Sequence, residues 1–247
     1  MDQEPENTKP DRPGDKPSPA APRRGKFITF EGGEGTGKST QAAMLAQRLE
    51  SLGIAVVRTR EPGGSPGAEI IRHVLLSGAA KPLGAEAEAM LFAAAREDHV
   101  RYAIEPALAA GKWVVCDRFA DSTRVYQGAL GRVDERLIKS LERVSIGDLS
   151  PDLTLILDLP VAEGLQRRSQ RRGDAAPDRF EAEDVEFHER LRQAYLALAA
   201  REPGRCVVIE ASGAKDDVAK LLWAAVESRL DPAVAPLSAE HRVSESA

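Results

Sequence analysis

The stretch Lys26–Leu52 reads KFITFEGGEGTGKSTQAAMLAQRLESL, and it decides the fold. It begins with a short apolar run that is typical of a buried strand, and it ends with apolar side chains at helical spacing. The segment between them matches G-x-x-x-x-G-K-S, which in this strand–turn–helix setting indicates a phosphate-binding loop. Its glycines allow the backbone to curl until several N–H groups point toward phosphate oxygens.

The loop predicts that the chain binds a nucleoside triphosphate. We expect Lys38 to set its ammonium against the β- and γ-phosphates and Ser39 to offer its hydroxyl to Mg²⁺. The helix that begins near Gly37 adds the positive end of its dipole. A plain glycine-rich turn with an exposed lysine is the alternative, and the spacing and the flanking elements disfavour it. The predicted nucleotide-binding residues are Gly32, Gly33, Glu34, Gly35, Thr36, Gly37, Lys38, Ser39 and Thr40.

The composition predicts one soluble domain between two tails. The chain has 247 residues, of which 42% are hydrophobic and 30% are charged. Residues 1–24 and 231–247 carry too few apolar side chains to offset the entropy of ordering, so we predict disordered tails. Residues 25–230 suffice for one α/β domain. No apolar run is long enough to span a membrane, and the net charge of −5 offers no broad basic surface for nucleic acid.

The cysteines predict a reducing, cytoplasmic setting. Cys116 and Cys206 both fall in predicted buried strands, so we expect reduced core residues and neither a disulfide nor a metal site. The first residues lack the apolar region of a secretory signal and are too acidic for a transit peptide.

Five apolar runs predict strands, and helical patterns separate them. The runs are nearly continuous, as in a parallel sheet covered on both faces. This alternation predicts an α/β fold with a doubly wound, five-stranded parallel sheet flanked by helices. Ligands of such folds gather outside the carboxyl ends of the strands. The predicted strands are Phe27–Glu31, Ile54–Thr59, Trp113–Asp117, Leu153–Asp158 and Cys206–Glu210.

Charged residues stand at two of these strand ends. Arg60 follows the second strand, where an arginine can hold a phosphate with two hydrogen bonds, although an ordinary surface arginine is the better reading of that segment alone. Asp117 closes the third strand, the position expected for the carboxylate that orients Mg²⁺ and its waters. Arg118 enters the same crevice.

Polar and aromatic residues follow Arg118 and suit the wall of a small pocket. They are Asp121, Ser122, Thr123, Tyr126, Gln127 and Gly128. Asp121 or Ser122 is also a candidate helix cap, which is compatible with ligand contact. Upstream, Phe92 and Arg96 share a helix face, so they could stack on a base and bond its edge. Spacing alone favours Phe92 as a core residue.

A basic helix is predicted over Val161–Arg172, and Gly173–Pro177 then breaks it. Such a flap could close over a triphosphate and stabilise the charge that passes between donor and acceptor. A solvated charged face or an RNA-binding patch explains the same composition. Its arginines are Arg167, Arg168, Arg171 and Arg172.

Together these segments resemble bacterial thymidylate kinases of the nucleoside-monophosphate kinase group. The motifs are FEGGEGTGKST, TREPGGSPGAE, LFAAARE, DRFADSTRVYQG and the basic segment that ends in DRFE. The resemblance covers nearly all of residues 25–230 and implies a P-loop kinase fold with an arginine-rich lid. It implies Mg²⁺-dependent transfer of a phosphoryl group from ATP to dTMP, and a homodimer. The phosphate loop is of the acidic type, without an arginine.

The resemblance also implies roles for individual residues. Arg60 and Arg118 would hold the phosphate of dTMP, Phe92 would stack on thymine and Arg96 would bond its edge. Thr123 and Gln127, with Ser122, would lie nearby. Glu34 would approach the sugar 3′-hydroxyl, and Tyr126 would sit beneath C2′ and disfavour a ribonucleotide. Arg168 and Arg171 would reach the donor phosphates, and Ser39 and Asp117 would serve the metal. An insertion around Asp174–Pro177 lengthens the lid.

Three other hypotheses stay open on the sequence alone. The first is a kinase for a different small acceptor, because the phosphate loop does not contact it. The second is a nucleotide-dependent switch; a guanine switch needs an Asn-Lys-x-Asp reader, and the only asparagine is Asn7 in the predicted tail. The third is nucleic-acid binding through the arginine cluster, which would weaken steeply with salt.

Overall fold

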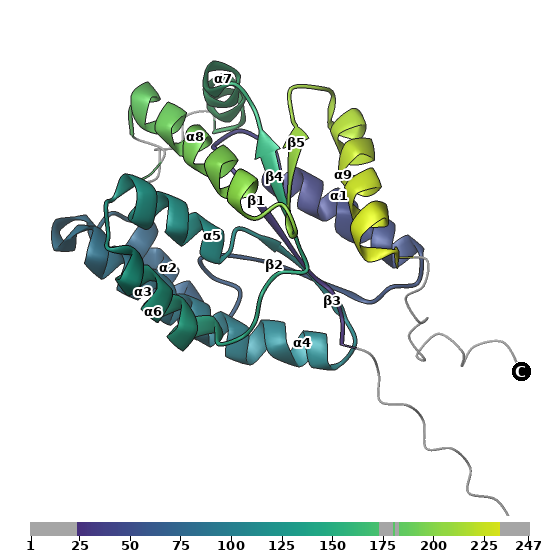
Figure 1. The fold of residues 1–247 in the computed structure, drawn as a ribbon, viewed down its shortest axis with the longest axis horizontal. Coiled ribbons are helices and arrows are strands. Elements are labelled where there is room, and N and C mark those ends of the chain that lie inside the picture. The colour runs from purple at the N-terminus through teal and green to yellow at the C-terminus, as the bar shows by residue number, and fades with distance from the viewer. Residues whose placement is uncertain (1–23, 173–179, 181–182, 233–247) are drawn as a thin grey trace, which may run out of the picture.

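The computed structural model describes residues 24–172, 180 and 183–232 (Figure 1). Nearly all of the two predicted tails lies outside the described residues, as does the predicted break at Gly173–Pro177. No helix in the part of the chain that is described is long and apolar enough to cross a bilayer.

The sheet has five parallel strands in the order β2-β3-β1-β4-β5, which confirms the predicted fold class. Three strands have the predicted bounds, and β1 is one residue longer. Because β1 lies at the centre, the loop that follows it emerges between the ends of β3 and β4. The strands are β1 (Phe27–Gly32), β2 (Val56–Arg60), β3 (Trp113–Asp117), β4 (Leu153–Asp158) and β5 (Cys206–Glu210).

The prediction was wrong in detail for the second strand. It begins at Val56 and not at Ile54, and it extends to Arg60. It is also partly exposed, because β2 is an edge strand that pairs only with β3. Ile54 instead belongs to the turn after the first helix, where its N–H donates to the carbonyl of Leu49 and its side chain is buried.

Helices connect the strands. Helix α3 continues through a π-helical turn (η2) into α4. The basic helix α7 has the predicted bounds. The helices are α1 (Lys38–Ser51), α2 (Pro66–Leu76), η1 (Lys81–Leu83), α3 (Gly84–His99), η2 (Val100–Ile104), α4 (Glu105–Ala109), α5 (Ala120–Thr123), η3 (Arg124–Leu130), α6 (Glu135–Ile146), α7 (Val161–Arg172), α8 (Val185–Arg201) and α9 (Lys215–Leu230).

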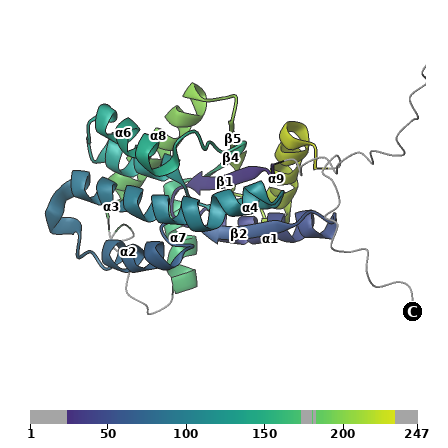
Figure 2. The ribbon, with the colours of Figure 1, turned by 90° about the horizontal axis from the view of Figure 1, so that it is seen from below.

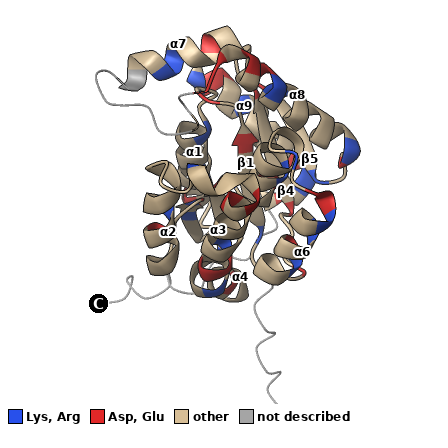
Figure 3. Cartoon of the chain, turned by 90° about the vertical axis from the view of Figure 1, so that its left-hand side faces the viewer, with Lys and Arg blue, Asp and Glu red and all other residues tan. Residues whose placement is uncertain are grey.

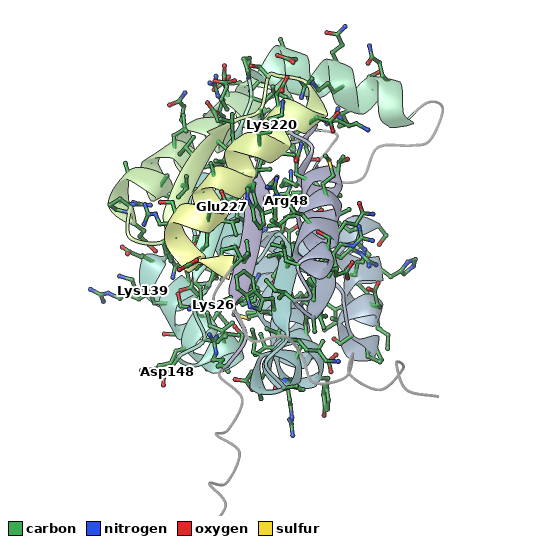
Figure 4. The ribbon with its side chains drawn as sticks, turned by 90° about the vertical axis from the view of Figure 1, so that its right-hand side faces the viewer. Lys26, Arg48, Lys139, Asp148, Lys220 and Glu227 are labelled. Carbon is green, nitrogen blue, oxygen red and sulfur yellow. The ribbon has the colours of Figure 1, made fainter. Side chains whose placement is uncertain are left out.

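Helices cover both faces of the sheet (Figures 1 and 2). Alternate residues of β3 point to opposite faces: Val115 packs in the cluster formed with α1 and α9, and Val114 packs in the cluster formed with η2 and α4. Helix α8 covers β4 and β5 through a third cluster. Arg48 of α1 lies against α9 (Figure 4), with its guanidinium carbon 3.9 Å from the ring centroid of Trp223.

Both cysteines are buried free thiols, as predicted from their positions in strands. Cys116 lies in the cluster beneath α4 and Cys206 in the cluster beneath α8.

Candidate active site

The phosphate loop joins β1 to α1 and lies directly against the start of α7. Gly35 has a φ of +71°, and a Cβ there would come within 1.9 Å of the carbonyl oxygen of Gly164. A Cβ on Gly164 would in turn come within 2.5 Å of the carbonyl oxygen of Glu34. Only glycine permits this approach of two backbones. It brings the basic helix α7, which crosses the top of Figure 3 with blue segments, to the loop.

Lys38 is folded back onto the loop. Its Nζ donates to the carbonyl oxygens of Gly33 at 2.6 Å and Gly32 at 3.2 Å, and the residue is 7% exposed. Burial lowers the pKa of Lys38 and the charge of Arg118 adds to this effect, while Glu34 opposes it, so the pKa falls to about 8. The ammonium is therefore held where it lacks a full negative counter-charge, which a phosphate would supply.

Glu34 and Arg118 form an ion pair across the loop. Arg118 Nη2 donates to Glu34 Oε1 at 2.5 Å. Burial raises the pKa of Glu34, but Arg118 and Lys38 outweigh it and bring the pKa down to about 2. The backbone of Arg118 has a φ of 70°, a conformation that is uncommon outside glycine and frequent at functional sites. The sequence predicted that Arg118 enters this crevice, but it did not reveal the pairing.

A cavity of about 310 Å³ opens on one side of the loop. It is lined by residues from the ends of β2 and β3, from α3 and from the loop itself. Pro62, Arg72 and Leu76 also line it, and the sequence had not singled them out. The cavity brings together the predicted residues Glu34, Gly35, Gly37, Lys38, Ser39, Arg60, Phe92, Arg96, Asp117, Arg118, Ser122, Thr123, Tyr126 and Gln127.

Phe92 lies in the wall of this cavity and is only half-buried, so the core reading that its spacing favoured was wrong. Its ring centroid is 6.1 Å from that of Phe180. Arg96 is 2% exposed; its Nη2 donates to Thr123 Oγ1 at 3.0 Å and to the carbonyl of Phe119 at 3.3 Å. Arg60 lies at the rim, where its Nη2 donates to Glu69 at 2.9 Å and 3.1 Å.

Asp121 was predicted to line the pocket or to cap a helix, but it does not line this cavity and does not cap α5. Its carboxylate accepts hydrogen bonds from Arg205 at 2.6 Å and 2.8 Å, on the far side of α5 from the cavity. Ser122 does not cap the helix either: its hydroxyl donates to Glu31 Oε2 at 2.7 Å. The short helix turns these neighbouring side chains in different directions, so only Ser122 reaches the cavity.

A second cavity, of about 280 Å³, lies on the other side of the loop. The loop residues Gly35 and Gly37 line both cavities, and Thr36 and Thr40 line the second but not the first. Arg168 of α7 also lines it, and its Nε and Nη1 are buried and have no hydrogen-bond partner among the residues that the structure describes. Arg167 is engaged, because it donates to the carbonyls of Ala211 and Ser212. The side chains of Arg171 and Arg172 lie outside the described residues.

Ser39 and Asp117 meet in the wall of the first cavity, at the start of α1. The hydroxyl of Ser39 donates to Asp117 Oδ2. Strand pairing explains the contact, since Phe30 of β1 is in register with Asp117 of β3 and α1 begins a few residues later. The hydroxyl and the carboxylate are hard oxygen donors, the type that Mg²⁺ prefers.

Comparisons with known proteins agree with this geometry. The family model of thymidylate kinase matches residues 30–222. The thymidylate kinase of Bradyrhizobium sp. (strain ORS 278) is 62% identical over 217 residues, which are 88% of this chain and 96% of that protein. The thymidylate kinase of Nitrobacter winogradskyi is 63% identical over 207 residues, which are 84% of this chain and 90% of that protein. The chain belongs to the thymidylate kinase family.

The fold of this chain also matches that of a solved thymidylate kinase. The crystal structure of thymidylate kinase from Ehrlichia chaffeensis superposes with a TM-score of 0.67 at 34% identity, and the match covers 82% of this chain and 99% of that one. The resemblance drawn from the sequence motifs is thereby confirmed at the level of the family.

Sequence reasoning also missed Phe180, Glu31 and Tyr195. Phe180 lines the first cavity, and its ring centroid is 5.3 Å from that of Tyr126. Glu31 and Tyr195 lie beneath Arg118: the Tyr195 hydroxyl donates to Glu31 Oε2 at 2.9 Å and accepts from Arg118 Nη1 at 3.3 Å. A carboxylate inside an apolar strand was the one signal that could have indicated Glu31.

Proposed function

We propose that the chain phosphorylates dTMP to dTDP with ATP and Mg²⁺, a step in dTTP synthesis. The observation that carries the proposal is the pair of cavities on opposite sides of one phosphate loop. A protein that only binds a triphosphate needs one of them. Phosphoryl transfer needs two anions in line with the charge between them neutralised, and both cavities present cations to the loop.

The first cavity suits the acceptor. Arg60 and Arg118 would bind the phosphate of dTMP, and each now pairs with a carboxylate that this phosphate would replace or rearrange. Phe92 would stack on thymine and Arg96 would bond the base edge, with Thr123 and Gln127 alongside. Glu34 would approach the 3′-hydroxyl, and Tyr126, whose hydroxyl is 3.4 Å from Glu34 Oε1, would lie beneath C2′.

The second cavity suits the donor. Lys38 and the N–H groups of residues 33–40 would hold the β- and γ-phosphates, and Arg168 would reach them from α7. A phosphate oxygen of dTMP would attack the γ-phosphorus while the bond from that phosphorus to the β-phosphate oxygen breaks, which releases ADP. Closure of the lid would exclude water and so limit hydrolysis of ATP.

Ser39 and Asp117 fit Mg²⁺ by their chemistry, since both present oxygen donors beside the phosphate loop. Magnesium usually takes one or two protein oxygens and completes its shell with waters and substrate phosphates. When bound, the ion would neutralise charge on the β- and γ-phosphate oxygens. The metal assignment predicts that Asp117→Asn raises the Mg²⁺ concentration for half-maximal rate more than it changes the KM for dTMP.

We also propose a homodimer. Helix α3 packs between α2 and α6, and this layer exposes apolar side chains: Ile70 is 71% exposed, Met90 49% and Val144 77%. Single exposed apolar residues are normal, but a row across three adjacent helices suits a second copy. Light scattering should give twice the chain mass for the wild type and a monomer for Ile70→Glu. A wild-type monomer would refute the proposal.

The reaction is tested by measuring ADP release with a panel of nucleoside monophosphates. ADP release should require Mg²⁺ and dTMP, and UMP, CMP and AMP should be much weaker acceptors. Equal rates with all of them would refute the substrate and leave the fold unaffected. Steady ATP hydrolysis without an acceptor would instead favour a regulatory NTPase.

A further inference from the structure

A row of hydrogen-bonded polar side chains, formed by Glu61, His99 and Thr59, lies behind Arg96. Arg96 Nε donates to Glu61 Oε2 at 2.8 Å, His99 Nδ1 lies 3.0 Å from Glu61 Oε1, and His99 Nε2 lies 2.7 Å from Thr59 Oγ1. The side chains of Arg96, Glu61 and His99 are 2%, 4% and 0% exposed. Nothing in the transfer of the phosphoryl group requires this row, yet it ends on the residue proposed to read the base.

The row fixes the position of every donor within it. A carboxylate only accepts hydrogen bonds, so Arg96 and His99 both donate to Glu61. With the His99 proton on Nδ1, the neutral ring accepts the Thr59 hydroxyl at Nε2. Each oxygen of Glu61 thus already accepts a hydrogen bond within the row, although the residue lines the acceptor cavity. The row therefore links Glu61 to a ligand through Arg96.

Hydrogen bonds hold two of the three nitrogens of the Arg96 guanidinium. Nε is held by Glu61, and Nη2 is held by the carbonyl of Phe119 and the hydroxyl of Thr123. Nη1 has no hydrogen-bond partner among the described residues, and Arg96 lines the acceptor cavity. The guanidinium therefore presents only donors to that cavity, and its plane cannot rotate without breaking buried hydrogen bonds.

We infer that Glu61 and His99 are positioning residues that hold Arg96 in the one orientation that selects a 4-oxo pyrimidine over a 4-amino pyrimidine. This inference rests on the proposed function, because it needs a pyrimidine nucleotide in the acceptor cavity. A fixed donor pairs with a carbonyl oxygen at position 4. An amino group at the same position meets it donor to donor, and a buried donor is left unpaired. A mobile arginine could swing aside and lose this discrimination.

The experiment compares dTMP, dUMP and dCMP as acceptors. The base of dUMP lacks the methyl group of thymine and differs from that of dCMP only at N3 and at position 4. The dUMP/dCMP ratio of kcat/KM therefore removes the methyl group from the comparison and reports on the base edge that Arg96 would read. Glu61→Gln and His99→Leu should lower both the dTMP/dCMP and the dUMP/dCMP ratios by about tenfold, with little change in the KM for ATP. His99→Asn, which keeps an N–H donor near the position of Nδ1, should recover part of the loss.

Glu69→Gln is the matched control. It removes a carboxylate that pairs with Arg60, a proposed phosphate ligand, and the phosphate is common to all three acceptors. It should therefore change the three kcat/KM values by one factor and leave both ratios unchanged. Thr59→Val breaks the far end of the row with an almost unchanged shape, so it supplies the same measurement if the other variants do not fold.

Equal losses for all three nucleotides, or a lower melting temperature with unchanged ratios, would overturn the inference and leave the row as a structural tie between β2 and α3. If dCMP turnover is too slow to measure, the ratios of the dissociation constants of the three nucleotides should shift in the same direction as the ratios of kcat/KM. A wild type that releases no ADP with dTMP would refute the proposed function instead, and nucleotide binding would still decide the inference.

Discussion

Replacement of Lys38 by methionine should separate stability from activity. The side chain is buried against the phosphate loop, and its ammonium bonds two backbone carbonyls. Methionine keeps most of the length and apolar contact of lysine but removes the charge. We expect Lys38→Met to lose phosphoryl transfer and to keep the fold.

The magnitude follows from the pKa. Burial and Arg118 lower the pKa of Lys38 from 10.5 to about 8, so the folded protein disfavours the charged form by about 3 kcal/mol. The two lost hydrogen bonds offset about 2 kcal/mol of this. Lys38→Met should thus be about 1 kcal/mol more stable than the wild type at pH 7.

The stability difference between Lys38→Met and the wild type changes sign at high pH. Between pH 8 and 10.5 the unfolded chain binds a proton at Lys38 that the folded protein does not, so the wild type gains stability as pH rises through this window. Lys38→Met cannot gain it. Near pH 10.5 the variant should be the less stable protein, by about 2 kcal/mol.

The assay is urea unfolding followed by circular dichroism at several pH values between 7 and 10.5, with the difference between variant and wild type plotted against pH. Lys220→Met removes an exposed lysine of α9 (Figure 4) and serves as the control, since its difference should not reverse sign. If the stability difference between Lys38→Met and the wild type did not change with pH, the view that the Lys38 ammonium is desolvated would be refuted. Strong residual turnover would refute its role in catalysis.

Three further predictions concern the same crevice. Phe92→Ala should raise the KM for dTMP by about 5- to 100-fold and leave the KM for ATP nearly unchanged; equal effects on both would indicate simple packing. Arg168→Ala should lower kcat and the affinity for ATP, and normal ATP kinetics would argue against its contact with the donor. Burial and Asp121 raise the pKa of Glu31 from 4.5 to about 7, so the folded protein favours the protonated acid. The stability of the wild type relative to Glu31→Gln should therefore be greatest below pH 4.5 and fall as pH rises through 7, by about 3 kcal/mol at most. Melting temperatures of the two proteins that change in parallel with pH would contradict this.

Local pattern was enough to predict the fold and most of the candidate site. Apolar runs separated by helical segments allow only parallel strands with crossover helices, and the carboxyl ends of such strands meet at one edge. Arg60, Asp117 and Arg118 could therefore be expected beside the phosphate loop without any knowledge of tertiary contacts. The edge position of β2 was not foreseen, because strand order leaves little trace in composition.

Helical spacing indicates which side chains share a helix face, but it does not indicate which elements or cavities that face contacts. Phe92 and Arg96 were correctly placed on one face of a helix, yet only the packing of α3 against α5, together with its side-chain hydrogen bond to β2, turned that face toward a cavity. Asp121 shows the converse: it suited a pocket, and the fold turned it toward Arg205.

The sequence by itself determined the phosphate loop, the parallel sheet and the list of residues able to bind phosphate or base, since these depend on residue type and local period. Only the tertiary structure decided the partners across the crevice. The pairing of Phe30 with Asp117 makes Glu34 and Arg118 emerge side by side, and the packing of α3 sets Arg96 on Glu61. Such contacts join residues tens of positions apart, so they arise from strand register and helix packing, which no local pattern encodes.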